Sequence, residues 1–123
     1  MRLLLDSHVL LWWDSDPEKL SSVQRDAISD PENEILVSAV SAWELGIKAA
    51  TGKLVISHSI AAIAERFGFI ELPITLIHGQ RAASLPMLHK DPFDRMLVAQ
   101  AMVERLTLVT ADRRLGEYGV KTL

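Results

Sequence analysis

The 123-residue sequence contains no cysteine. This absence excludes a disulfide framework, a thiolate zinc site and a cysteine nucleophile, and it agrees with a reducing compartment such as the cytoplasm. No apolar run approaches the roughly 20 residues that a membrane-spanning helix requires. The N-terminal segment reaches Asp6 after only three leucines, too soon for the core of a signal peptide. We therefore expect a soluble cytoplasmic protein with no membrane partner.

An excess of positive charge is also missing. Lys and Arg number 13 against 16 Asp and Glu, so the formal net charge is −3. Nucleic-acid-binding domains usually carry the opposite balance, and the total charge by itself argues against a nucleic-acid binder. Apolar residues, by contrast, make up 49% of the chain, which supplies a core and excludes intrinsic disorder. At this length we expect one domain, residues 1–123.

Short apolar segments alternate with segments of helical periodicity. The expected strands are 3–5, 35–37, 69–72, 106–109 and a weak fifth at 120–123. The expected helices are about 21–29, capped by Ser21 or Ser22, then 40–50, 59–66, 75–84 and one that starts at Pro92 with Asp91 as its N-cap. Strands that alternate with helices imply parallel pairing through crossovers. We therefore predict a three-layer α/β/α fold with a central, mostly parallel five-stranded sheet.

Four carboxylates are expected at the carboxyl edge of this sheet, where sites form in open α/β folds. Asp6 ends the first strand, and Asp112 lies two residues beyond the fourth. Glu44 lies on the polar face of the helix after the second strand, and Asp94 lies in the first turn of the helix before the fourth. Because all four positions fall on the same side of the sheet, these acids can converge.

Carboxylates brought together repel one another unless a cation compensates their charge. Oxygen ligands without His or Cys suit Mg²⁺, or Mn²⁺ as the alternative, rather than zinc. Sites of this kind hydrolyse phosphodiesters by positioning a water and by neutralising charge on the attacking and leaving oxygens. The four acids therefore predict metal-dependent phosphoryl chemistry.

The acids also occur within a series of short motifs. These are Leu3-Leu4-Leu5-Asp6-Ser7, Ser38-x-x-Ser41-x-x-Glu44, His89-x-Asp91-Pro92-Phe93-Asp94-Arg95, Asp94-Arg95-x-x-x-Ala99-Gln100-Ala101 and Thr110-Ala111-Asp112. In this order they resemble the motifs of PIN-domain nucleases, and more narrowly those of the VapC-type toxins of toxin–antitoxin pairs. The resemblance extends from residue 3 to about residue 122. Ser7 stands where Thr is common and Leu115 where an aromatic residue is frequent, and neither position belongs to the acid set.

The resemblance implies a five-stranded parallel sheet, dependence on Mg²⁺ or Mn²⁺, and endonucleolytic cleavage of RNA. It also implies a homodimer that is silenced by a small antitoxin, with DNA reached only through that antitoxin. Carried over position by position, the metal-binding and catalytic acids are Asp6, Glu44, Asp94 and Asp112.

Other residues near the acids are predicted to support the chemistry or to contact the substrate. Auxiliary roles are predicted for Ser7, Asp91, Thr110 and His89, and contacts with RNA phosphates for Lys48, Arg95, Arg113 and Arg114. Several have a structural alternative: Asp91 as a helix cap, Lys48 as the helical ion-pair partner of Glu44, His89 as a structural or solvated loop residue, and the three arginines as solvated surface.

Two other functions stay open on the sequence. A non-catalytic PIN-like scaffold or binding protein would keep the fold without the chemistry. An aspartyl phosphoacceptor domain would also place an Asp after the first strand. Phosphatases of that class place a second Asp two residues later, where this chain has His8, and receiver domains use a late Lys, where this chain has Thr110 and Asp112.

Overall fold

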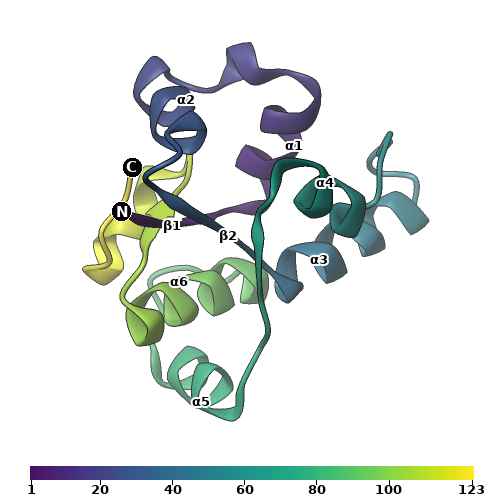
Figure 1. The fold of residues 1–123 in the computed structure, drawn as a ribbon. Helices are drawn as coiled ribbons and strands as arrows, with labels where there is room; N and C mark the ends of the chain where they lie inside the picture. The colour runs from purple at the N-terminus through teal and green to yellow at the C-terminus, as the bar shows by residue number, and fades with distance from the viewer.

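The computed structural model describes residues 1–123 and contains one parallel sheet in the strand order β3-β2-β1-β4 (Figure 1). Its strands are β1 (Arg2–Leu5), β2 (Glu34–Ser38), β3 (Ile70–Leu72) and β4 (Thr107–Val109). The central strand β1 pairs with β2 and β4, so that Leu4 lies opposite Leu36 on one side and Leu108 on the other. All pairings are parallel, and the carboxyl ends of the strands therefore share one edge of the sheet.

Six α-helices and two 3₁₀ turns connect the strands. They are α1 (Ser7–Ser15), η1 (Pro17–Lys19), α2 (Ser22–Ser29), α3 (Ala39–Ala50), α4 (Ile60–Phe67), α5 (Leu76–Ser84), α6 (Pro92–Glu104) and η2 (Arg113–Tyr118). Ser21 and Asp91 cap α2 and α6 through their side chains, as the sequence predicted. None of the helices combines the length and apolar character that crossing a membrane requires.

The side chains of β1 divide between two cores, one on each face of the sheet. Leu4 packs into a cluster with α6 residues such as Leu97, whereas Leu3 and Leu5 pack into a second cluster with Val9 of α1. Figure 1 shows α5 and α6 on one side of the sheet and α1 and α2 on the other. This arrangement confirms the three-layer prediction and explains why β1 is apolar at successive positions.

The predicted fifth strand is not formed, so the sheet has four strands instead of five. The segment 120–123 meets β4 at a single bridge between Leu108 and Thr122. Two backbone hydrogen bonds of 2.9 Å support it, from the N–H of Leu108 to the carbonyl of Lys121 and from the N–H of Leu123 to the carbonyl of Leu108. Gly119, in a left-handed conformation at φ 86°, ends η2 directly before this segment, and a third hydrogen bond of 3.2 Å runs from the N–H of Thr110 to the carbonyl of Leu123.

The helix α1 was not predicted from the sequence. Asp6 ends β1 and at once caps this helix, because its carboxylate accepts the backbone N–H of Val9 at 2.9 Å. The signal was a capping residue followed by apolar residues at helical spacing, of which Val9 and Leu10 are buried. The direct passage from strand to helix fixes Asp6 at the carboxyl edge of the sheet.

Candidate active site

Asp6 is a nearly buried carboxylate at the carboxyl end of β1, with 6% of its surface exposed. Burial raises its pKa, and hydrogen bonds from Thr110 and from the backbone of Val9 oppose that effect. The negative charge of Glu44 raises the pKa of Asp6 further, so the two carboxylates are electrostatic neighbours. The protein therefore holds a desolvated acid next to a second acid, an arrangement that a cation would stabilise.

Glu44 projects from α3 and is 3% exposed. Its Oε1 accepts the hydroxyl of Ser7 at 2.6 Å, and its Oε2 accepts the ammonium of Lys48 at 2.8 Å. The Ser7 hydroxyl also lies 3.2 Å from that of Ser41, one turn earlier on α3. Ser7 and Lys48 thus fix the orientation of the Glu44 carboxylate, and the hydrogen bond with Glu44 raises the pKa of Lys48.

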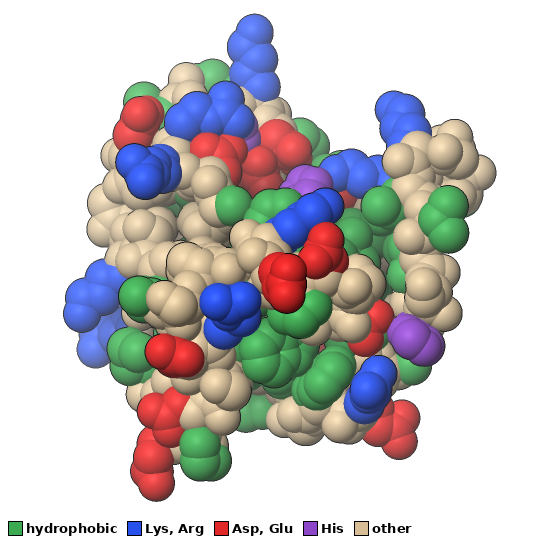
Figure 2. Space-filling view, turned by 90° about the horizontal axis from the view of Figure 1, so that it is seen from above, with side chains coloured by type: hydrophobic (Ala, Val, Ile, Leu, Met, Phe, Trp, Pro, Cys, Tyr) green, Lys and Arg blue, Asp and Glu red, His purple; other side chains and the backbone are tan.

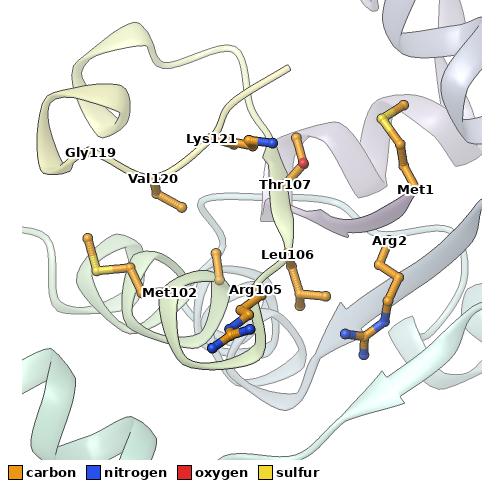
Figure 3. A pocket seen from close by; sticks show the side chains of 10 residues that line it. Met1, Arg2, Met102, Arg105, Leu106, Thr107, Gly119, Val120 and Lys121 are labelled. Carbon is orange, nitrogen blue, oxygen red and sulfur yellow. The ribbon is translucent and has the colours of Figure 1, made fainter.

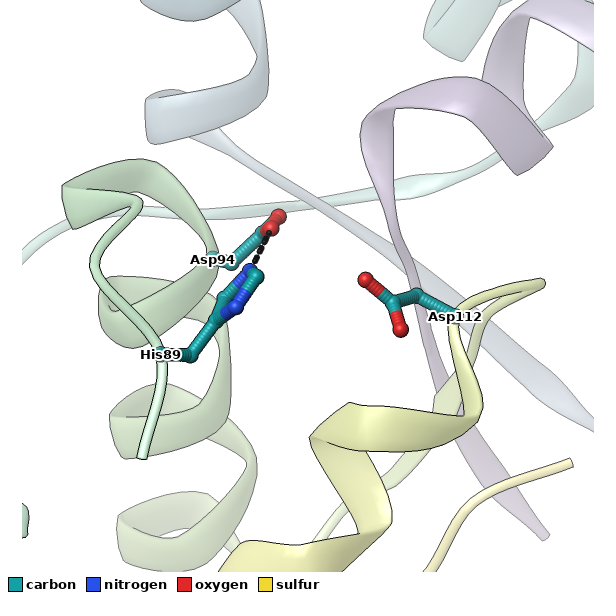
Figure 4. A group of neighbouring side chains, drawn as sticks. All are labelled: His89, Asp94 and Asp112. Atoms are coloured by element: carbon teal, nitrogen blue, oxygen red, sulfur yellow. Dashed lines mark hydrogen bonds and ion pairs between the residues drawn. The ribbon is translucent and has the colours of Figure 1, made fainter. Parts of the chain in front are cut away.

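Asp94 lies in the first turn of α6 and faces His89 (Figure 4), with 2.8 Å between its Oδ2 and the Nε2 of His89. Burial raises the pKa of Asp94; the hydrogen bond with His89 lowers it, and the charges of Asp91 and Glu44 raise it. Asp91 is the helix cap and accepts the backbone N–H of Phe93 at 2.8 Å. Asp91 therefore acts as a helix cap, which was its structural alternative. The cap stabilises the turn that carries Asp94.

Asp112 approaches from the opposite side, at the start of η2 (Figure 4). Its two oxygens accept the Nε and Nη2 of Arg114 at 3.0 and 2.8 Å, and this pairing lowers the pKa of Asp112. One ligand atom from each of His89, Asp94 and Asp112 lies within 4.8 Å of the others. These three side chains are therefore spaced to share one cation.

The donor set fits a hard divalent cation. Asp6 and Asp94 both have pKa values raised by burial and by neighbouring carboxylates, which is the signature of negative charge without compensation. The Oδ1 of Asp94 has no hydrogen-bond partner in the protein, and each oxygen of Glu44 keeps a lone pair beyond its single bond. An oxygen-rich set of this kind suits Mg²⁺ or Mn²⁺.

The cations predicted to contact phosphate are placed differently from one another. Lys48 and Arg114 pair with acids of the site, and Arg113 is exposed and free of ion pairs. Arg95 does not face the acids: it is 9% exposed, and its guanidinium donates to the backbone carbonyls of Ala82, Leu85 and Pro86, each at 3.0 Å. The expectation for Arg95 is corrected, because its donors anchor the connection between α5 and α6.

One polar contact behind the site was not predicted from the sequence. Gln100, fully buried in α6, accepts the hydroxyl of Ser38 at 2.5 Å and donates to the carbonyl of Pro73 at 3.2 Å. Ser38 is also the N-cap of α3. The bond therefore ties the helix that carries Glu44 to the helix that carries Asp94. The available signal was that Gln100 is the only polar residue in the apolar stretch 96–103.

Comparisons with known proteins agree on one family. The model of the PIN domain matches residues 3–121. The chain is 33% identical over 119 residues to Ribonuclease VapC22 of Mycobacterium tuberculosis, a match that covers 94% of this chain and 91% of that protein.

Solved structures show the same fold at much lower sequence identity. VapBC2 from Rickettsia felis, bound to a DNA fragment from its promoter, superposes with a TM-score of 0.71 at 15% identity and covers 100% of this chain and 98% of that one. VapBC-1 from nontypeable Haemophilus influenzae gives a TM-score of 0.66 at 20% identity, with coverage of 100% and 97%. FitAcB from Neisseria gonorrhoeae gives 0.60 at 18%, with coverage of 98% and 96%.

Proposed function

The chain belongs to the PIN-domain family, and from this we propose that it is a metal-dependent endoribonuclease and the toxin of a toxin–antitoxin pair. The observation that carries the proposal is the gathering of acids at the carboxyl edge of the sheet, where burial and mutual repulsion raise the pKa of Asp6 and Asp94. RNA as the substrate is supported by the relative named as a ribonuclease. A small antitoxin as the partner is supported by the VapBC structures.

Asp6, Glu44, Asp94 and Asp112 would hold the metal, which when bound neutralises charge on the phosphodiester and activates the attacking water. Ser7 and Lys48 keep the Glu44 carboxylate in one orientation, and His89 does the same for Asp94. The imidazole of His89 beside Asp94 and Asp112 favours Mn²⁺ over Mg²⁺ if it joins the ligand set, since Mg²⁺ prefers oxygen donors.

We propose that two basic side chains of the site exchange their carboxylate partners for phosphates of the substrate. Lys48 and Arg114 now occupy oxygens of Glu44 and Asp112. If these carboxylates held a divalent ion, Lys48 and Arg114 would be free to contact RNA phosphates, whereas the exposed Arg113 is already unpaired.

A homodimer is proposed on the basis of apolar side chains that the single chain leaves exposed beside the site. Trp43 and Ile47 of α3 are 63% and 40% exposed, and Trp43 contacts Phe93 edge to face, with 5.2 Å between ring centroids. An exposed tryptophan braced in this way suits the buried centre of an interface between two copies.

The decisive test uses protein purified free of antitoxin. Asp94→Asn is expected to reduce cleavage of RNA by at least about a hundredfold, because it removes a charged metal ligand while preserving shape. Added chelator is expected to abolish cleavage by the wild type, and Mn²⁺ or Mg²⁺ to restore it. Asp26→Asn, at an exposed acid of α2 without an ion pair, is the matched control and should cleave normally.

Unchanged cleavage by Asp94→Asn, or full activity in chelator, would contradict the mechanism. Expression in cells provides a second readout. Growth arrest that survives alanines at all four acids would favour a PIN-like binding protein that acts without catalysis.

A further inference from the structure

A hollow of about 610 Å³ lies at the end of the molecule opposite to the acids (Figure 3). It is bounded by the first residues of β1 and β4, the C-terminal end of α6 and the segment after η2. Its volume is in the range of sites for small organic ligands. Because it adjoins the amino ends of parallel strands whose carboxyl ends carry the acids, it is separate from the candidate active site.

The lining of this hollow is positively charged and contains no acid. Three of its ten residues are the cations Arg2, Arg105 and Lys121, and none is Asp or Glu, in a chain whose acids outnumber its bases. In the view of Figure 3, Leu106 lies between Arg105 and Arg2, and the side chain of Lys121 lies farther away, beside Thr107. The charge around the hollow is thus opposite in sign to that of the chain as a whole.

Two of the three cations have no partner in the protein. Arg2 pairs with Glu34 at 3.3 Å and donates to the carbonyl of Glu104 at 3.1 Å. The side chains of Arg105 and Lys121 make no hydrogen bond or ion pair. The carboxylate next in sequence to Arg105, that of Glu104, lies 3.1 Å from the ring of His78 instead. Two unpaired positive charges at one hollow are suited to an anion.

Arg105 occupies a backbone position that normally favours glycine. It ends α6 in the left-handed region, at φ 56°, and is the only residue other than glycine with positive φ. Glycine adopts this conformation at a helix C-terminus without steric cost, whereas a residue with a Cβ does not. Arg105 therefore holds its guanidinium at the rim of the hollow from a backbone conformation that carries some strain.

We propose that this hollow binds a nucleoside phosphate. The unpaired side chains of Arg105 and Lys121 would attract the phosphate, and the apolar side chains Met102, Leu106 and Val120 would contact the base. An apolar wall beside a cationic rim suits a ligand with a flat apolar part and a charged part better than it suits phosphate alone. The site stands independently of the proposed nuclease activity, and either a free nucleotide or the 5′-phosphorylated end of an RNA strand supplies this chemistry.

The test is calorimetric titration of the full chain in buffer with chelator, which disfavours phosphate at the acidic site. The probes are adenosine 5′-monophosphate, uridine 5′-monophosphate, adenosine, inorganic phosphate, and a short oligoribonucleotide with or without a 5′-phosphate. Nucleotides are expected to bind more tightly than phosphate, and adenosine not to bind. Arg105→Gly and Lys121→Ala should each weaken binding about tenfold or more. Lys53→Ala, at an exposed and unpaired lysine remote from the hollow, should change nothing.

The stability of Arg105→Gly provides a second readout. Because glycine relieves the left-handed strain, its melting temperature is expected to be no lower than that of the wild type. Lys121→Ala keeps the backbone carbonyl that accepts the N–H of Leu108, so this variant is expected to fold. It therefore tests the proposal if Arg105→Gly does not fold. Binding of free nucleotides identifies a soluble ligand, and binding of the 5′-phosphorylated RNA alone identifies a strand end. Binding of neither, or binding that both variants leave unchanged, overturns the proposal.

Discussion

At the scale of single residues, two acids of the site are held in opposite electrostatic environments. Burial raises the pKa of Asp6, and Glu44 adds to that effect, whereas the hydrogen bonds from Arg114 lower the pKa of Asp112. Both acids follow a strand, and both cap the helical turn that comes next. Their difference comes from their neighbours: a second carboxylate for Asp6 and a guanidinium for Asp112.

Asp6→Asn is expected to stabilise the metal-free protein at pH 7, by on the order of 1 kcal/mol, because it removes a buried charge that no cation compensates. Asparagine keeps the cap on α1. Since the pKa of Asp6 is higher in the folded chain than in the unfolded chain, its ionisation costs stability above the raised pKa. That cost disappears as the pH falls through the raised value toward 3.8, and the variant and the wild type should converge there.

Urea unfolding in chelator across this pH range measures the effect. Asp112→Asn is the comparison, because the lowered pKa of Asp112 contributes stability that is present above 3.8 and is lost as the pH falls through the folded-state value. It should therefore not stabilise the protein at pH 7. A loss of stability in Asp6→Asn that matches the loss in Asp112→Asn would contradict this account of the site.

At the scale of elements, α6 carries both a site acid and the residues that fix the helix in place. Asp91 caps its first turn, and Gln100 ties its middle to Ser38 at the end of β2. Arg95, one residue after Asp94, donates to three carbonyls at the C-terminal end of α5 and beyond it. The position of Asp94 therefore depends on contacts made along the whole helix.

Arg95→Met is expected to lower the free energy of unfolding by about 2–4 kcal/mol, because methionine fills the volume of the stem and leaves three carbonyls without a partner. Arg113→Met, at an exposed and unpaired arginine, should change it by less than about 0.5 kcal/mol. Urea denaturation of both variants measures the difference. Normal stability of Arg95→Met combined with weaker RNA binding would instead indicate that Arg95 contacts RNA phosphate.

At the scale of the whole molecule, the negative net charge does not show how acidic and basic residues are distributed along the chain. Removing the four site acids from the 16 leaves 12 acids against 13 bases, a balance of +1 for the rest of the chain. On the face shown in Figure 2, acidic and basic side chains are interspersed, and no continuous basic surface covers it. Under the proposed assignment of these four acids to one metal site, the excess negative charge lies at that site, and one divalent ion there would change the total from −3 to −1.

RNA binding is accordingly expected to depend on metal. Chelator should weaken the affinity of the catalytically slow Asp94→Asn variant as well as that of the wild type, because carboxylates without a cation repel phosphate. Filter binding or fluorescence anisotropy with and without Mn²⁺, at fixed ionic strength, measures the change. Equal affinity in both buffers would mean that RNA binds away from the acids.

The sequence by itself determined the layers of the fold, the helix caps at Ser21 and Asp91, and the four acids with their family resemblance. These follow from apolar periodicity, capping chemistry and strand order, which are properties of short segments. The predicted fifth strand forms only one bridge with β4, because the apolar pattern of a segment does not report how far its backbone pairs with a neighbouring strand.

Only the tertiary structure decided which side chains meet. It placed His89 against Asp94, buried Arg95 among carbonyls, and gathered Arg2, Arg105 and Lys121 around one hollow. These contacts depend on how helices, loops and strand ends pack in space, and burial then sets how strongly the charges interact. The periodicity of a short segment indicates neither which distant side chains come into contact nor how deeply they are buried.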